Sequence, residues 1–184
     1  SIYLLGNERC RRVMSVFGWS KSFGIAGMRI GCVYTTDPAL FERMVEKSDV
    51  MSTAGGISSL SQIAGTACMH NYDWVDAFLV HLKGNRDYAV DRLKHMPLVK
   101  AYAPRATYLL YVDIRAFGMK SEDFTDYMKQ KVKLALVSGG EKFFGQGSEG
   151  YIRICFATSR GILEEGLNRL EQGIRMLMEE KGLH

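Results

Sequence analysis

The longest regular pattern in the chain is an amphipathic segment at residues 72–96, and it divides the rest of the sequence. Apolar side chains recur along it at helical spacing, which predicts one long helix with an apolar stripe. Pro97 ends this helix, because proline lacks an amide proton and clashes with the preceding turn. The predicted stripe consists of Trp74, Phe78, Leu79, Leu82, Tyr88, Ala89 and Leu93. We therefore expect an α/β protein with one domain at residues 1–72 and a second, α+β domain at residues 73–184.

Short apolar runs alternate with helical segments before the long helix. Residues 12–19 and 31–36 are rich in β-branched and aromatic residues, which predicts two buried strands joined by a glycine-containing loop. Asp37 and Pro38 are typical of a helix start, and they predict a helix at residues 37–49. Small polar residues follow, and a second helix is expected from about Ser58. Both tryptophans, Trp19 and Trp74, are expected in the core.

The part after Pro97 has the pattern of a small sheet covered by helices. A helix at residues 120–132 is expected to be capped by Ser121. A final helix at residues 159–182 follows a glycine-rich loop and a strand. The predicted strands are residues 99–104, 107–114, 134–140 and 150–157. The predicted apolar stripe of the last helix is Ile162, Leu163, Leu167, Leu170, Ile174 and Leu177.

Composition argues against several functional classes. The net charge of +4 is small, its local clusters are residues 9–12 and 129–133, and the lysine run of the second has the pattern of a solvated helix face, so we expect no nucleic-acid partner. No apolar run approaches the length of a membrane span, and no signal peptide is visible. The four cysteines and four histidines lack the spacing of a metal site, so we expect no metal, reduced thiols and a cytoplasmic location.

The segment SKSFGIAGMRIG, residues 20–31, places two cations among small and apolar residues. A lysine at the end of a buried strand can act as a Schiff-base nucleophile, and Arg29 offers a rigid fork for phosphate or carboxylate. Ser20 adds a hydroxyl beside Lys21, and the glycines allow the backbone to approach a ligand closely. These residues are compatible with a site for a phosphate-bearing aldehyde cofactor. They are equally compatible with a surface loop that carries two ordinary cations.

A second candidate residue is Arg153 in the alternating segment GYIRICFATS, residues 150–159. Alternation places Tyr151, Arg153 and Cys155 on one face of a strand and the neighbouring apolar side chains on the other. An arginine at the centre of such a strand either pairs with a buried acid or binds the acidic group of a ligand. The residues alone favour the structural salt bridge.

Both segments resemble the motifs of fold type I pyridoxal-phosphate enzymes, the class I and II aminotransferase superfamily. The resemblance implies that Lys21 is catalytic: it forms the Schiff base with pyridoxal 5'-phosphate and moves protons at the substrate α-carbon. It also implies that Ser20 and Arg29 bind the cofactor phosphate and that Arg153 binds the substrate α-carboxylate. The family often has a serine three residues before the lysine, and Gly18 stands there in this chain.

The resemblance covers the whole chain and implies a particular organisation. Residues 1–72 correspond to the end of the large cofactor-binding domain, a mixed sheet with helices, and residues 73–184 to the small C-terminal domain. The rest of the large domain supplies several cofactor contacts in this family. The chain, which begins at Ser1, is therefore expected to be a C-terminal portion that is inactive alone. The complete enzyme is expected to be a homodimer that acts on an amino acid and a 2-oxo acid, with the segment 52–59 near the dimer interface.

Three functions remain open at this point. Arg29 and Cys155 favour an aminotransferase, because the cystathionine β-lyase-type subgroup often lacks the arginine and has asparagine at the second position. The segments 106–118 and 139–154 look more like that lyase subgroup, so a C–S β-lyase is the first alternative. A non-catalytic scaffold or sensor domain is the alternative from another class.

Overall fold

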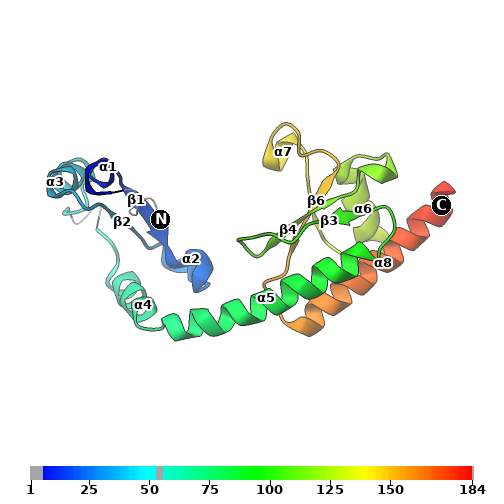
Figure 1. The fold of residues 1–184 in the computed structure, drawn as a ribbon, viewed down its shortest axis with the longest axis horizontal. Helices are drawn as coiled ribbons and strands as arrows, with labels where there is room; N and C mark the ends of the chain where they lie inside the picture. The colour runs from blue at the N-terminus through cyan, green and yellow to red at the C-terminus, as the bar shows by residue number, and fades with distance from the viewer. Residues whose placement is uncertain (1–5, 53–55, 184) are drawn as a thin grey trace. The chain divides into compact units, whose positions relative to one another are not determined.

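The computed structural model of the chain describes residues 6–52 and 56–183, and it divides into two compact units. The first unit ends at Ala77 and the second begins at Phe78, so the boundary lies inside helix α5 (Tyr72–Lys94). The predicted long helix is therefore confirmed, and it contributes to both units (Figure 1). None of the described helices is long and apolar enough to span a membrane.

The first unit is built around a two-stranded antiparallel sheet. Strand β1 (Ser15–Gly18) pairs with β2 (Gly31–Tyr34), and Gly18 lies opposite Gly31. Helix α1 (Asn7–Cys10) precedes the sheet, while α2 (Trp19–Ser22) and the 3-10 turn η2 (Ala26–Met28) lie in the connection between the strands. Helices α3 (Pro38–Lys47) and α4 (Ser59–Met69) follow.

The sequence patterns locate both of these helices correctly, because their first turns depend on local chemistry. The Asp37 carboxylate accepts hydrogen bonds from the amides of Ala39 and Leu40, at 2.9 and 3.3 Å. Ser58 is the N-cap of α4, and its hydroxyl accepts a hydrogen bond from the Ser61 amide. Such caps satisfy amides that have no partner inside the helix. Residues 53–55 of the predicted interface segment 52–59 lie outside the described residues.

The predicted burial of the first strand is wrong. Val16 is 81% exposed, and three of the four β1 residues are exposed. Strand β2 is also more exposed than predicted, with Val33 at 42% and Tyr34 at 48%, because in the described part of this unit no second layer covers the two-stranded sheet. Trp19 is buried as expected, but Trp74 is 48% exposed, and it stacks on Phe23 with ring centroids 5.7 Å apart.

The second unit contains a four-stranded antiparallel sheet with the order β3-β4-β6-β5. Its strands are β3 (Lys100–Ala101), β4 (Leu109–Asp113), β5 (Val137–Ser138) and β6 (Tyr151–Cys155). Helices α6 (Ser121–Val132) and α8 (Arg160–Lys181) cover the sheet together with the second-unit part of α5, which lies beside α8 (Figure 1). The short elements η3 (Arg115–Phe117) and α7 (Glu141–Phe144) precede α6 and β6.

The core of the second unit follows the predicted periodicity with three exceptions. Five of the six predicted α8 stripe residues are buried, but Ile162 in the first turn is 66% exposed. On α5, Leu79 is 55% exposed, whereas Asn85 is fully buried. Asn85 Nδ2 donates to the carbonyls of Phe156 and Thr158, at 3.0 and 2.8 Å, so a polar group occupies the helix face that apolar periodicity assigns to the core.

The predicted cap at Ser121 is also wrong. Lys120 is the N-cap of α6 and makes no side-chain cap hydrogen bond. The Ser121 hydroxyl instead accepts hydrogen bonds from the amides of Gly150 and Tyr151, at 2.8 and 3.2 Å. The Glu149 carboxylate accepts from the Ser121 amide at 2.6 Å, and this bond is the main cause that lowers the pKa of Glu149. The start of α6 is therefore held by the loop before β6, a contact that the local sequence does not reveal.

Candidate functional site

Lys21 lies on α2, the single helical turn that follows β1 directly. Its side chain is exposed, and that of Ser20 beside it is half-buried. The neighbouring Trp19 is buried and fixes the turn, and its ring meets Phe17 edge to face with centroids 5.5 Å apart. The geometry leaves the lysine amine accessible while its backbone is held by the adjacent aromatic ring.

Arg29 lies at the other end of the same connection, between η2 and β2. Its backbone is left-handed, with φ +49°, which is uncommon for a residue with a side chain. The side chain is exposed. The connection is closed at its base by the pairing of Gly18 with Gly31, where an added Cβ on Gly31 would lie 3.0 Å from the Phe17 carbonyl oxygen.

The structure therefore brings Ser20, Lys21 and Arg29 onto one short connection, residues 19–30, between two paired strands. Across residues 6–52 and 56–183, no carboxylate forms a salt bridge with either cation. Two cations without acidic partners are available to an anionic ligand. The strand that leads into them is exposed, so the expectation of a lysine at the end of a buried strand is not met within this unit.

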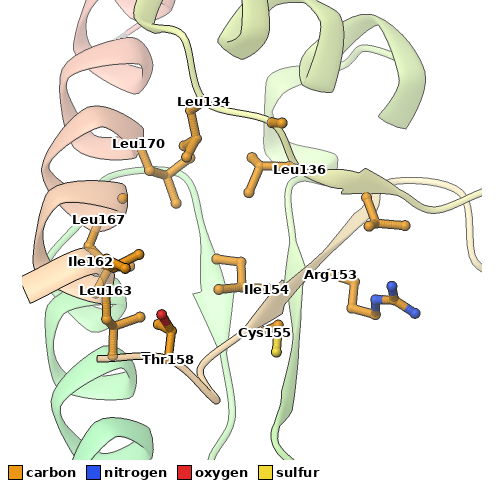
Figure 2. A pocket seen from close by; sticks show the side chains of 13 residues that line it. Leu134, Leu136, Arg153, Ile154, Cys155, Thr158, Ile162, Leu163, Leu167 and Leu170 are labelled. Atoms are coloured by element: carbon orange, nitrogen blue, oxygen red, sulfur yellow. The ribbon is translucent and has the colours of Figure 1, made fainter. Parts of the chain in front are cut away.

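Arg153 lies at the centre of β6 in the second unit. It is opposite Tyr111 on β4 and Val137 on β5, and its side chain is half-buried. The predicted alternation is confirmed, because Ile152 and Ile154 on the other face are buried. Figure 2 shows Ile154 pointing toward the leucines of α8 while the Arg153 guanidinium points away from them.

The Phe144 ring lies against the guanidinium of Arg153, and two further aromatic rings follow it in a chain of contacts. The central carbon of the guanidinium lies 5.4 Å from the centroid of the Phe144 ring, within the range of a cation–π interaction. Phe144 meets Tyr111 edge to face at 5.5 Å, and Tyr111 stacks on Tyr151 at 5.3 Å. No salt bridge to Arg153 occurs within the described ranges, so the structural ion pair that the residues alone favour is wrong there.

An apolar hollow of about 280 Å³ lies on the core side of β6. Leucines of α8 and of the segment before β5 line it together with Ile154, and Cys155 and Thr158 lie near its rim (Figure 2). The Arg153 stem touches this hollow, but its charged end does not point into it. The hollow therefore does not form the anion site of this arginine.

Two residues that shape the second unit, Phe144 and Asn85, are not among the residues to which the sequence assigns a role. Phe144 belongs to a glycine-bounded loop that reads as irregular, although it forms the short helix α7. Asn85 interrupts an apolar stripe, and that interruption is a usable signal for a buried hydrogen-bonding residue. Among the described residues, no group of three histidine, cysteine or acidic side chains is arranged to hold a metal ion.

Comparison with known proteins places these features in a family. The family model described as aminotransferase class I and II matches residues 4–170. The chain is 31% identical over 159 residues to the aspartate aminotransferase of Pyrococcus horikoshii, a match that covers 85% of this chain and 39% of that protein. It is 28% identical over 163 residues to a cystathionine beta-lyase of Bacillus subtilis, covering 84% of this chain and 40% of that protein.

The chain is also similar in structure to a solved pyridoxal-phosphate protein. Cystalysin from Treponema denticola, whose crystal structure contains a pyridoxal 5'-phosphate cofactor, matches with a TM-score of 0.81 and 26% identity. This match covers 94% of the chain and 44% of cystalysin. The chain therefore spans about two fifths of the length of the curated relatives.

The family match extends through both units and includes every residue for which the sequence predicts a role: Ser20, Lys21, Arg29 and Arg153. The mixed helix and strand content and the structural likeness confirm the predicted α/β class. With a family model that matches most of its length, this chain belongs to the class I and II aminotransferases.

Proposed function

We propose that the chain carries part of the site of a pyridoxal-phosphate-dependent aminotransferase that acts on an amino acid and a 2-oxo acid. The observation that carries this proposal is the placement of Lys21 and Arg29 on one short connection, both exposed and without acidic partners among the described residues. In this proposal, residues 1–72 are the end of the large cofactor-binding domain of a fold type I enzyme and residues 73–184 its small domain.

The residues of the connection fit such a cofactor. A primary amine, a guanidinium and a hydroxyl match an aldehyde and a phosphate group. The same connection contains two buried polar atoms, Trp19 Nε1 and Ser22 Oγ, that have no hydrogen-bond partner in the described part of the chain. A bound anion supplies acceptors of the kind that such donors need.

Each site residue has a distinct proposed role. The Nζ atom of Lys21 holds the cofactor and then moves a proton at the substrate α-carbon, as general base and general acid. Arg29 and Ser20 bind the phosphate and fix the orientation of the cofactor. Pyridoxal phosphate, when bound, delocalises the electron pair that is left at the α-carbon after the proton is removed.

Arg153 is proposed to bind the substrate α-carboxylate. Its planar fork offers two parallel N–H donors to the two carboxylate oxygens. Phe144 lies over the guanidinium and Tyr111 contacts that ring, so one face of the guanidinium is covered by apolar surface. Partial removal of water strengthens the attraction between the two charges, because the effective dielectric constant falls.

The relatives also favour a second reaction. A cystathionine beta-lyase matches nearly as much of the chain as the aspartate aminotransferase does, at slightly lower identity. We therefore propose C–S β-elimination as the alternative. The complete enzyme is proposed to be a homodimer.

The two reactions release different products, and product analysis of the native protein that contains this chain tests them. An aminotransferase converts an amino acid to its 2-oxo acid and transfers nitrogen to a second 2-oxo acid, without ammonia. A lyase releases ammonia, pyruvate and a thiol from cystathionine or a related thioether. Lys21→Ala removes either activity if the proposed role is right. Activity that survives this substitution, or no turnover of amino acids by the native protein, contradicts the proposal.

A further inference from the structure

The left-handed backbone of Arg29 requires an explanation, because this conformation costs roughly 1–2 kcal/mol for a residue other than glycine. It persists only where surrounding structure imposes it. Arg29 is exposed, and none of the ion pairs formed within residues 6–52 and 56–183 involves its side chain. Its amide closes the η2 turn by donating to the Ala26 carbonyl oxygen at 3.3 Å, and the residues that flank it are held by contacts from outside this turn.

Ser61 of α4 holds the residue before Arg29. Its side chain is 7% exposed, and its hydroxyl donates to the Met28 carbonyl oxygen at 2.6 Å. The cap of this helix is supplied by Ser58, whose hydroxyl accepts from the Ser61 amide and lies 3.3 Å from the Ser61 hydroxyl. A buried hydroxyl is retained where it has a partner, and here that partner is a backbone group 33 residues away in the sequence.

Gly65 of the same helix holds the residue after Arg29. A Cβ added at Gly65 would lie 2.8 Å from Cδ1 of Ile30 and 3.9 Å from the ring of Trp19. The absence of a side chain therefore lets Ile30 pack directly on the helix. Ser61 and Gly65 are four residues apart and share one face of α4. That face contacts the residues on both sides of Arg29.

We propose that Ser61 and Gly65 are positioning residues that fix Arg29 in its left-handed conformation and direct its guanidinium to the phosphate of a ligand on Lys21. The backbone conformation of a residue sets the direction of its side chain, so a return of Arg29 to an ordinary conformation turns the guanidinium elsewhere. This inference rests on the proposed function for its ligand, but its backbone part is independent of that function.

The first experiment needs no ligand. The dipolar coupling between the amide and α protons of Arg29, measured as their nuclear Overhauser effect on the chain 1–184, reports the sign of its φ angle, because these two protons lie closer together at positive φ. We expect Ser61→Ala to change this coupling. Ser59→Ala, on an exposed residue of the same helix, is the matched control and should leave it unchanged. An unchanged Arg29 coupling in folded Ser61→Ala overturns the inference, whatever the chain binds.

The second experiment compares two probes that differ only in the phosphate. Pyridoxal phosphate and pyridoxal are titrated separately, and cofactor absorbance measures binding to Lys21. Arg29→Ala is expected to reduce the preference for pyridoxal phosphate by about tenfold, the loss of one charge-assisted contact. Ser61→Ala should reduce the same preference and leave pyridoxal affinity unchanged. Gly65→Val should act in the same direction, because its side chain displaces Ile30.

The outcomes separate the two claims. If the unsubstituted chain shows no preference that depends on Arg29, the proposed phosphate role of Arg29 fails, and the Arg29 coupling still decides whether Ser61 fixes the backbone. If Arg29→Ala removes the preference but Ser61→Ala does not, the proposed function stands and the positioning role fails. A parallel loss of affinity for both probes in Ser61→Ala indicates a merely structural role and also overturns the inference.

Discussion

Replacement of Asn85 should destabilise the second unit more than replacement of an exposed asparagine. Asn85 is fully buried on α5, and its Nδ2 donates to the carbonyls of Phe156 and Thr158. These carbonyls belong to the segment that follows β6, the strand of Arg153. The contact therefore holds α5 against the end of β6, the strand that carries Arg153, the residue proposed to bind the substrate carboxylate.

The expected magnitude follows from counting the groups that lose partners. A buried carbonyl without its donor costs about 1–3 kcal/mol. His81 Nε2 also lies 2.8 Å from the Thr158 carbonyl oxygen and can donate to it. The Phe156 carbonyl oxygen is therefore the group that loses its side-chain donor when Asn85 is replaced. Asn85 Oδ1 has no partner among the described residues, and its removal recovers part of a desolvation penalty. We expect Asn85→Ala to cost about 2–3 kcal/mol with its cavity, and Asn85→Leu about 1–2 kcal/mol because it fills the space.

Urea unfolding of the chain, followed by far-ultraviolet circular dichroism, measures these differences through the shift of the midpoint at constant slope. The matched control is Asn168→Ala. The exposed Asn168 on α8 accepts a hydrogen bond from Arg92, and its loss should cost less than about 0.5 kcal/mol. An Asn85→Ala variant that unfolds at the same urea concentration as Asn168→Ala would refute the reasoning.

Two further predictions concern the loop before β6. Phe144→Leu should weaken binding of a monocarboxylate probe to Arg153 by about threefold, because a cation–π contact of about 0.5–1 kcal/mol is lost. Phe143→Leu is the control and should leave the affinity unchanged, because the Phe143 ring does not cover Arg153. A titration followed at the Arg153 Nε resonance measures both affinities, and equal effects of the two substitutions contradict the assignment. The second prediction concerns pH. The hydrogen bond from the Ser121 amide lowers the pKa of Glu149 in the folded chain. The stability that the Glu149 carboxylate contributes is therefore complete above its unfolded-state pKa, and it is lost as the pH falls through the lower folded-state pKa. Glu149→Gln should cost about 0.5 kcal/mol near neutral pH, since the carboxylate is exposed and screened, and the difference from the unsubstituted chain should vanish in acid; a difference that is independent of pH argues against this role.

The sequence predicts those parts of the fold that depend on neighbours in the chain. Asp37 and Pro38 locate the start of α3, and Ser58 locates the start of α4, because a cap acts on amides two or three residues away. The alternation around Arg153 identifies the buried face of β6, because successive side chains of a strand point to opposite faces of the sheet. The family motif identifies Lys21 and Arg29 as candidates, although their proposed roles stay predictions.

The features that the sequence does not predict depend on contacts between distant segments. Ser121 looks like a cap, yet its hydroxyl accepts hydrogen bonds from the start of β6. Trp74 has the character of a core residue, but it stacks on Phe23 at the surface. The left-handed backbone of Arg29 has no local signal at all, since the groups that flank it are held by α4, more than thirty residues away.

The central claim is that Lys21 is the residue that holds the cofactor. The most direct measurement is borohydride reduction of the native protein with pyridoxal phosphate, followed by peptide mapping by mass spectrometry. The account predicts one reduced adduct on the peptide that contains Lys21, and none on the exposed Lys47 of α3, whose side chain is 83% accessible. An adduct distributed over exposed lysines in proportion to their accessibility, or one that persists unchanged after Lys21→Ala, would contradict the account.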